Sequence, residues 1–283
     1  MSITFDHIPI EEYANNLYQS EVCVTPINGL AAFDQAMIEQ YHELGFVSVA
    51  NAINQQEIDS VLGAMLDIVL DENAKGVQLQ FENEARGKVE EVGRDRYLDY
   101  VRKFMWFSHL HPATQTLMYH PELVKILENL LGGEVEMFQD MALLKPPGIG
   151  REKPWHQDHA YFNLPEGTPV VGVWIALDDA TPDNGCMHFL PGRHKQGPVP
   201  HWDRRDWQIC DSEILSASGQ VATPLPAGGC LIFDGLTPHG TPTNRSNTRR
   251  RAIQWHYVRK GTPRTTTEER MAIFGNEGKE VSC

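Results

Sequence analysis

The sequence reads Val170-Val171-Gly172-Val173-Trp174-Ile175-Ala176-Leu177, and Thr181-Pro182-Asp183-Asn184-Gly185 follows shortly after. The first stretch is short, apolar and rich in β-branched residues, which is typical of a buried strand. The second stretch is made of Pro, Asp, Asn and Gly beside one Thr, and these residues favour turns. The pair therefore predicts a buried strand followed by a turn.

The same alternation of strand and turn continues through the second half of the chain. Strand-like stretches occupy residues 135–144, 186–190, 230–233 and 250–258, and turn residues lie at Pro146-Pro147-Gly148 and Pro226-Ala227-Gly228-Gly229. Short strands at such spacing favour an all-β sandwich or barrel. We therefore expect a barrel core over about residues 134–260 and a tail over 261–283.

The first third of the chain, about residues 1–133, predicts helices that support this core. Three stretches carry apolar residues at helical spacing, with a short strand at residues 46–49 after the first. The stretches are Phe33, Met37, Tyr41 and Leu44, ending at Gly45; Ile58, Leu62, Met65 and Val69, opened by a capping-box pattern of Asn54 and Glu57; and Leu123, Ile126, Leu127 and Leu130, from Pro121 to Gly132.

The stretch from Lys75 to Arg96 is dense in charge and lacks clear periodicity. We interpret it as a loop. Because it precedes the core and has no apolar face of its own, we predict a lid that becomes ordered when substrate binds.

Length and charge restrict the class of protein. A chain of 283 residues fits one β domain with supporting helices, so we expect a single domain over residues 1–283. The formal net charge of −14 disfavours nucleic acid or an anionic membrane as the main partner. No apolar run approaches the ~20 residues of a membrane-spanning helix. The amino-terminal residues lack the pattern of a signal peptide.

The cysteines indicate a reducing compartment. Their number is odd, they are scattered, and none forms a Cys-x-x-Cys pair, so we expect reduced thiols in a cytoplasmic protein. A small-molecule partner fits this picture, and a homodimer is left open. The five cysteines are Cys23, Cys186, Cys210, Cys230 and Cys283.

One short motif carries chemistry: Pro154-Trp155-His156-Gln157-Asp158-His159. On a strand, His156 and Asp158 point to the same face, whereas Gln157 points away. A third metal ligand is available at His239, in a turn directly after the strand at residues 230–233. Two histidines and one carboxylate form the facial triad of non-haem Fe(II) oxygenases, which leaves three coordination positions open.

Chance alone also produces His-x-Asp triplets in a chain with 12 histidines. What supports the metal site is Arg250, which lies on the strand that follows His239. A guanidinium inside a barrel requires an anion, because an unpaired buried cation is costly, and a dicarboxylate that chelates the metal would supply one. Arg249 and Arg251 alternate with Arg250, so we expect them to form a solvated face.

These segments make the chain similar to the phytanoyl-CoA dioxygenase superfamily of Fe(II)- and 2-oxoglutarate-dependent oxygenases. The resemblance implies a double-stranded β-helix of the jelly-roll or cupin-like type, iron at His156, Asp158 and His239, and Arg250 on the distal carboxylate of 2-oxoglutarate. The similar segments are Tyr41-His42-Glu43-Leu44-Gly45-Phe46, His120-Pro121-Glu122-Leu123, His156-x-Asp158, Gly172-Val173-Trp174-Ile175-Ala176-Leu177-Asp178-Asp179, Asn184-Gly185-Cys186, Leu190-Pro191-Gly192-x-His194, and His239 followed by Arg250.

Further cosubstrate contacts are implied by the same resemblance. Thr241 would donate to the same carboxylate, and Met141 and Trp174 would line the pocket, with plain core packing as their alternative. Lys103 is the basic residue nearest to the expected position, with Arg102 as its rival and a solvated charge as the alternative. Candidate substrate contacts are Tyr161, Phe162, Gln254 and His256.

The reaction implied is hydroxylation of an unactivated C–H bond of a small organic substrate, with O₂ and 2-oxoglutarate consumed and succinate and CO₂ formed. A halogenase is disfavoured by Asp158, since halide needs that coordination position. A metal-dependent isomerase or hydrolase would not need Arg250, and a non-catalytic binding module would tolerate its loss. The sequence does not separate an acyl thioester, amino acid, phosphonate or natural-product intermediate as substrate.

Overall fold

The strand expected at residues 170–177 lies inside the larger of two main β-sheets. The computed structural model describes residues 1–71 and 73–275, and within these ranges the larger sheet has nine strands. Their spatial order is β1 (Ser2–Phe5), β5 (Gln78–Phe81), β6 (Val101–Met105), β7 (Val135–Lys145), β16 (Arg250–Arg259), β9 (Val171–Ala176), β14 (Cys230–Asp234), β4 (Phe46–Ala50) and β3 (Ile27–Asn28). The smaller sheet has the order β2 (Val22–Cys23), β13 (Val221–Thr223), β10 (Met187–Phe189), β15 (His239–Thr241) and β8 (Lys153–His156). The prediction of a mainly β protein is confirmed.

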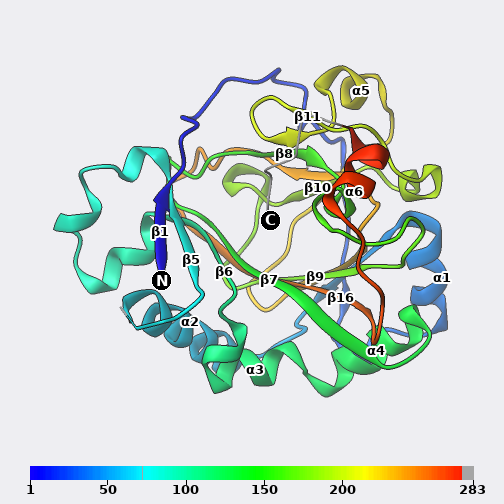
Figure 1. The fold of residues 1–283 in the computed structure, drawn as a ribbon, viewed down its shortest axis with the longest axis horizontal. Helices are drawn as coiled ribbons and strands as arrows, with labels where there is room; N and C mark the ends of the chain where they lie inside the picture. Colours follow the sequence, from blue (N-terminus) through cyan, green and yellow to red (C-terminus); the bar gives the residue numbers. More distant parts are fainter. Residues whose placement is uncertain (72, 276–283) are drawn as a thin grey trace.

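The two sheets face each other across an aromatic core. The ring of Phe46 on β4 stacks on the ring of Phe189 on β10, with centroids 4.4 Å apart. Trp174 of β9 and Phe233 of β14 belong to the same buried cluster. Figure 1 shows β8 and β10 above β7, β9 and β16. This arrangement is the jelly roll of a double-stranded β-helix, as expected.

Three helices cover the outer face of the larger sheet: α2 (Gln55–Leu70), α3 (Pro112–Met118) and α4 (Pro121–Leu131) (Figure 1). Val173 and Ile253 belong to one buried cluster with Met65 of α2 and Leu127 of α4. Their strand neighbours point instead into the core between the sheets, because successive side chains of a strand alternate between faces. The larger sheet is therefore buried on both faces.

The helix ends lie where the sequence predicts them. α1 (Gln35–Leu44) ends at Gly45 and α4 ends at Gly132, and these glycines have left-handed φ values of 85° and 70°. The capping box is also formed. Oδ1 of Asn54 accepts from the backbone N–H of Glu57 at 3.1 Å, and the carboxylate of Glu57 accepts from the backbone N–H of Asn54 at 2.8 Å. The strand expected at residues 46–49 is β4.

The first third of the chain is not only a helical support, since β1 and β3 to β6 belong to the larger sheet. The stretch from Lys75 to Arg96 was expected to be a loop, yet it contains β5, which pairs with β1 and β6. Leu79 and Phe81 of β5 are buried. This four-residue alternation is too short to stand out among the surrounding charges. The seven residues of α3 likewise offer too few apolar repeats to be recognised.

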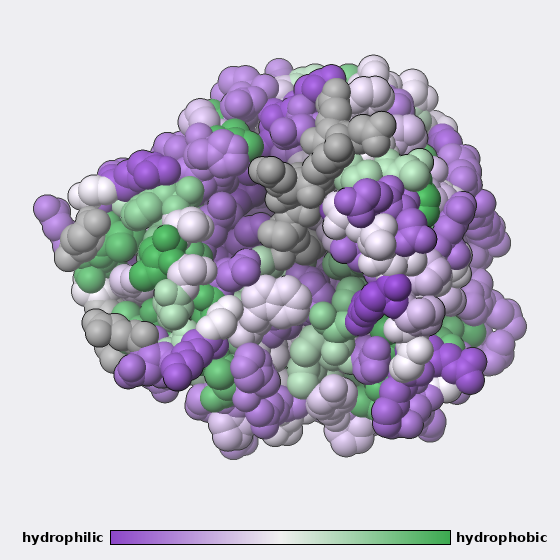
Figure 2. Space-filling model, viewed as in Figure 1, coloured by the Kyte–Doolittle hydropathy of each residue, from purple (hydrophilic) through white to green (hydrophobic). Residues whose placement is uncertain are grey.

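The expected tail is described up to residue 275 and contains α6 (Thr267–Phe274); residues 276–283 lie outside the described part of the chain. The face shown in Figure 2 is mostly hydrophilic, with hydrophobic residues in small groups, as the net charge of −14 leads one to expect. No helix of the described chain is long and apolar enough to cross a membrane.

Candidate metal centre

Pairing of β8 with β15 brings the two histidines of the motif together. The antiparallel register sets His239 opposite His156, and their ring centroids are 4.3 Å apart. His156 is the last residue of β8, and Asp158 begins the 3₁₀ turn Asp158–Tyr161. The 3₁₀ turn, and not strand alternation, therefore orients the carboxylate of Asp158 toward the two histidines. Its Oδ1 lies 3.2 Å from Nε2 of His156 and 3.7 Å from Nε2 of His239.

These three side chains form a buried group whose atoms are suited to hold a metal ion. One atom from each lies within 4.8 Å of the other two, and all three residues are buried. Nδ1 of His156 lies 2.7 Å from the carbonyl of Pro154, and Nδ1 of His239 lies 2.9 Å from the carbonyl of Thr237. Because a carbonyl only accepts, each Nδ1 carries the proton and each Nε2 offers a lone pair to the centre.

The protonation states suit a divalent cation. Burial lowers the pKa of His239 to about 4, so its imidazole is neutral at neutral pH. Burial alone would raise the pKa of Asp158, but the neighbouring imidazoles of His239, His256 and His156 outweigh burial and bring that pKa well below its usual value. Two imidazoles and one carboxylate match the ligand set of a non-haem Fe(II) centre.

The residues beside the ligands serve the fold. Gln157 points away from the centre, as expected, and its amide donates to the carbonyls of Leu236 at 2.7 Å and Gly197 at 2.9 Å. Strand alternation would turn His159 outward together with Gln157, but His159 is buried and its Nε2 bonds the carbonyl of Thr168 at 2.7 Å. Neither side chain is a ligand of this centre.

The centre opens into a cavity of about 530 Å³, a size typical of small-molecule sites. Most of the side chains expected at the site line it. Phe162 and His256 are not among the lining residues: Phe162 packs on His256 with ring centroids 4.7 Å apart. The expected residues that line the cavity are His156, Asp158, His239, Arg250, Thr241, Met141, Trp174, Lys103, Tyr161 and Gln254.

Arg250 is a buried cation on the wall of this cavity. Its Nη1 donates to the carbonyl of Leu143 at 3.0 Å, its guanidinium lies 5.4 Å from the ring centroid of Trp174, and its Nε has no hydrogen-bond partner. Burial lowers its pKa to about 10. Since no carboxylate of the described residues lies within ion-pair distance, the cavity is suited to the carboxylate of a ligand.

The neighbouring arginines differ from each other. Arg249 is partly exposed, at 41% of its side chain, and pairs with Asp99 at 3.2 Å. Arg251 is mostly buried and binds Asp178 through two nitrogens at 2.8 and 2.7 Å. The prediction of a solvated face is wrong for Arg251, because Asp178 at the end of β9 supplies a bidentate partner.

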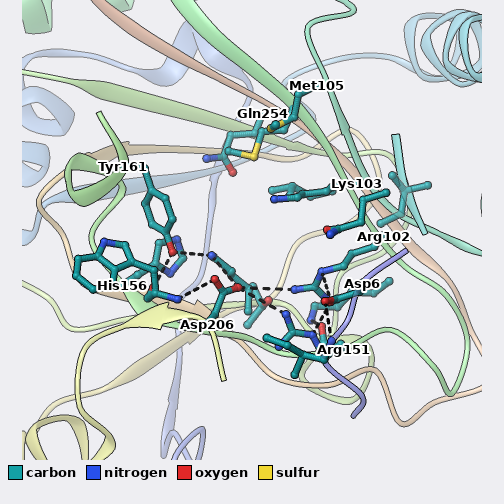
Figure 3. Close-up of a pocket in the computed structure, with 18 of the residues that line it drawn as sticks. Asp6, Arg102, Lys103, Met105, Arg151, His156, Tyr161, Asp206 and Gln254 are labelled. Atoms are coloured by element: carbon teal, nitrogen blue, oxygen red, sulfur yellow. Dashed lines mark hydrogen bonds and ion pairs between the residues drawn. The ribbon is translucent and has the colours of Figure 1, made fainter. Parts of the chain in front are cut away.

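One end of the cavity is polar, and hydrogen bonds and ion pairs join its side chains (Figure 3). Nζ of Lys153 donates to the hydroxyl of Tyr161 at 2.7 Å and to Asp206 at 3.0 Å. Asp206 follows β11 (Trp202–Asp203) and precedes β12 (Trp207–Gln208), so this hairpin edges the cavity. Sequence reasoning missed both residues, because isolated charges far apart in the chain give no signal of their meeting.

Arg102 is engaged in the same polar network. It lies 3.1 Å from Asp6 of the amino-terminal segment and 3.6 Å from Glu82. Arg151 binds the same oxygen of Asp6 at 2.9 Å. Arg102 and Lys103 both line the cavity, and Arg102 is the one with ion pairs to Asp6 and Glu82.

Comparisons with known proteins agree with this geometry. A family model described as phytanoyl-CoA dioxygenase (PhyH) matches residues 41–252. The phytanoyl-CoA dioxygenase domain-containing protein 1 homolog of Caenorhabditis briggsae is 25% identical over 260 residues, which cover 78% of this chain and 90% of that protein.

Two solved structures share the fold. EvdO2 from Micromonospora carbonacea var. aurantiaca, complexed with 2-oxoglutarate, has a TM-score of 0.61 at 25% identity, covering 80% of this chain and 91% of its own. The non-haem α-ketoglutarate-dependent carbocyclase SnoK from nogalamycin biosynthesis has a TM-score of 0.65 at 21% identity, covering 86% and 90%. The second likeness shows the fold alone.

Proposed function

This chain belongs to the phytanoyl-CoA dioxygenase family, and from that premise we propose that it is an Fe(II)- and 2-oxoglutarate-dependent dioxygenase. The reaction proposed is hydroxylation of an unactivated C–H bond of a small organic molecule, with succinate and CO₂ as co-products. One observation carries the proposal: a buried His-Asp-His set and the buried cation of Arg250, which lacks a carboxylate among the described residues, share one cavity.

The residues present suit both groups. Nε2 of His156, Oδ1 of Asp158 and Nε2 of His239 would hold the iron, and Arg250 with the hydroxyl of Thr241 would hold the distal carboxylate of 2-oxoglutarate. When bound, the iron supplies O₂ activation, with 2-oxoglutarate providing two of the four electrons and the substrate C–H bond the other two.

The protein's own contribution is to position and to exclude water. The carbonyls of Pro154 and Thr237 fix the two imidazoles by accepting their Nδ1 protons. Met141 and Trp174, both buried, form apolar wall of the cavity that Arg250 and the metal centre share, where they would limit access of water to the reacting groups. Arg250 would neutralise charge that an anionic cosubstrate brings into the cavity.

We place the substrate between the metal centre and the polar end of the cavity. Tyr161 and Gln254 remain the proposed contacts, since both line the cavity. Lys153 and Asp206 join them, because their charged ends are only partly buried, with 30% and 21% of the side chains exposed. A cavity that combines apolar wall with such polar groups suits a small substrate bearing hydrogen-bonding groups.

The test is a metabolite panel scored by succinate formation in the presence of Fe(II), 2-oxoglutarate and isotope-labelled O₂. Hydroxylation is expected to place one labelled oxygen atom in the product and one in succinate. Succinate without label in the product would point to a cyclisation or epimerisation, and substrate conversion without succinate would indicate an isomerase or hydrolase. Binding with no turnover of either compound would indicate a binding module.

We propose a cytoplasmic location and neither nucleic acid nor membrane as partner. Cys23, Cys186 and Cys230 are free thiols in the structure, which suits a reducing compartment; Cys283 lies outside the described residues. The acidic balance of charges supports a small molecule over a polyanion.

A further inference from the structure

The carboxylate of Asp158 uses its two oxygens differently. Oδ1 faces the two ligand histidines, whereas Oδ2 lies 2.7 Å from Nε2 of His256 and 3.2 Å from Nε2 of Gln254. A carboxylate oxygen that already accepts from a buried imidazole is not free to turn toward a metal. The contacts therefore fix which oxygen of Asp158 points into the centre.

His256 is itself held from several sides. Its Nδ1 lies 2.5 Å from the side-chain amide of Gln139, the residue opposite it in the register of β16 with β7. With the NH₂ of that amide facing the ring, Nδ1 accepts from Gln139 and Nε2 donates to Oδ2 of Asp158. Phe162 covers the ring with centroids 4.7 Å apart, and His256 has no exposed surface. A ring packed and bonded in this way has one orientation, and this rigidity is transmitted to Asp158.

One strand joins this contact to the anion site. Arg250, Gln254 and His256 all lie on β16, at positions that alternate onto the same face. Arg250 and Gln254 line the cavity, while His256 lies behind Asp158. The spacing between the cosubstrate-binding cation and the metal-binding carboxylate is therefore set by a single element.

We infer that His256 is a positioning residue, which holds Asp158 so that Oδ1 alone binds the metal. The inference rests on the proposed function only in requiring a divalent metal at the three ligands. A carboxylate restrained to one oxygen keeps three positions open, as the facial arrangement needs. His256 is neither a fourth ligand nor a substrate contact, because its Nε2 is bonded to Asp158 and it does not line the cavity.

The test measures metal binding without turnover. Co(II) serves as the probe, titrated against a competing chelator, because its visible spectrum reports coordination. Replacing His256 by Phe keeps a buried ring but removes both hydrogen bonds, and it is expected to weaken Co(II) binding roughly 10- to 100-fold, as loss of a partner to a ligand carboxylate does. His256→Gln, whose amide can still donate to Oδ2, is expected to recover most of the affinity.

The matched control is His159→Phe, which removes another buried imidazole from the same region. Since His159 bonds the carbonyl of Thr168 and not Asp158, Co(II) affinity is expected to change less than about threefold. Gln139→Leu supplies a second variant with His256 intact, and we expect a smaller loss of Co(II) affinity from it, because only the outer bond is removed.

Asp158→Ala separates the two levels of the proposal. If Asp158→Ala binds Co(II) as tightly as the unmodified protein does, the assignment of the metal centre itself is wrong. Loss of affinity in Asp158→Ala with no loss in His256→Phe would overturn only the positioning role. Equal losses in His256→Phe and His159→Phe, or no difference between His256→Phe and His256→Gln, would overturn it as well.

Discussion

Replacing Arg250 by methionine should stabilise the ligand-free protein and remove most of its response to 2-oxoglutarate. The guanidinium is buried, and burial lowers its pKa to about 10. Because the pKa falls from 12.5 to about 10, and each pKa unit corresponds to about 1.4 kcal/mol, keeping this cation charged costs up to about 3.5 kcal/mol at neutral pH. Methionine fills similar space without a charge, but it gives up the bond to Leu143 and the contact with Trp174. A net gain of about 1–3 kcal/mol is expected, as when buried charges are replaced by apolar groups.

The gain in stability from Arg250→Met should depend on pH in a definite direction. A base whose pKa is lowered on folding destabilises the folded state fully at pH values below its folded pKa. The penalty is relieved as the pH rises through about 10. The advantage of Arg250→Met should therefore be complete at neutral pH and shrink above pH 10, and chemical denaturation at several pH values measures it.

Arg250→Met should weaken the binding of 2-oxoglutarate, although it stabilises the ligand-free protein. Removing one partner of a desolvated charge pair costs about 2–5 kcal/mol, which corresponds to a rise of roughly 30- to 3000-fold in the dissociation constant of 2-oxoglutarate. Arg250→Lys is expected to recover little, because an ammonium offers a point charge in place of a planar fork. Thermal shift with increasing 2-oxoglutarate, at constant Co(II), measures both variants.

Arg249→Met is the matched control, since Arg249 is partly exposed and pairs with Asp99 outside the cavity. Its 2-oxoglutarate affinity should stay within about threefold of the unmodified protein. Unchanged affinity in Arg250→Met, or a large loss in Arg249→Met instead, would refute the assignment of the anion site to Arg250.

Three further predictions concern packing, acid stability and the expected lid. A Cβ at Gly172 would lie 2.4 Å from the ring of Phe233, so Gly172→Ala should destabilise by about 1–3 kcal/mol, whereas Gly63→Ala, in open space, should not; equal melting temperatures would contradict this. Burial lowers the pKa of His201 to about 3. The free energy of unfolding should therefore fall as the pH drops below 6.5, by about 2 kcal/mol at pH 5 from this ring alone. If the free energy of unfolding of His201→Gln falls with pH in parallel with that of the unmodified protein, His201 is not the cause. Hydrogen exchange of residues 82–96 should slow when substrate binds, while residues 78–81, held in the sheet, should change little; no change in either stretch would identify a permanently folded surface segment.

Much of the fold was predictable because the strands after Gly133 are apolar and bounded by turn residues. Helix ends were predictable where a glycine or a capping box marks them, as at Gly45 and Asn54. β5 and α3 were missed, since four and seven residues hold too few repeats of a period to be recognised.

The metal centre was predictable in composition but not in geometry. A short His-x-Asp spacing and a later histidine identified three residues that the structure brings together, but the sequence implied strand alternation where a 3₁₀ turn begins at Asp158. The sequence predicts a substrate contact at His256, but this residue does not line the cavity, because alternation gives the face of a residue and not its depth. The pairing of Lys153 with Asp206 depends on a hairpin that returns to the cavity, which no local pattern encodes.

Conversion of 2-oxoglutarate to succinate distinguishes a 2-oxoglutarate-dependent oxygenase from an isomerase, a hydrolase or a binding module. The measurement compares the unmodified protein with Asp158→Ala, with Fe(II) and O₂ each present or omitted, and with and without chloride, which could enter the vacated position. We expect succinate only when Fe(II) and O₂ are both supplied to the unmodified protein, and little or none from Asp158→Ala with its fold intact by circular dichroism. Full succinate formation by Asp158→Ala, with iron still bound stoichiometrically, would contradict the proposed metal centre.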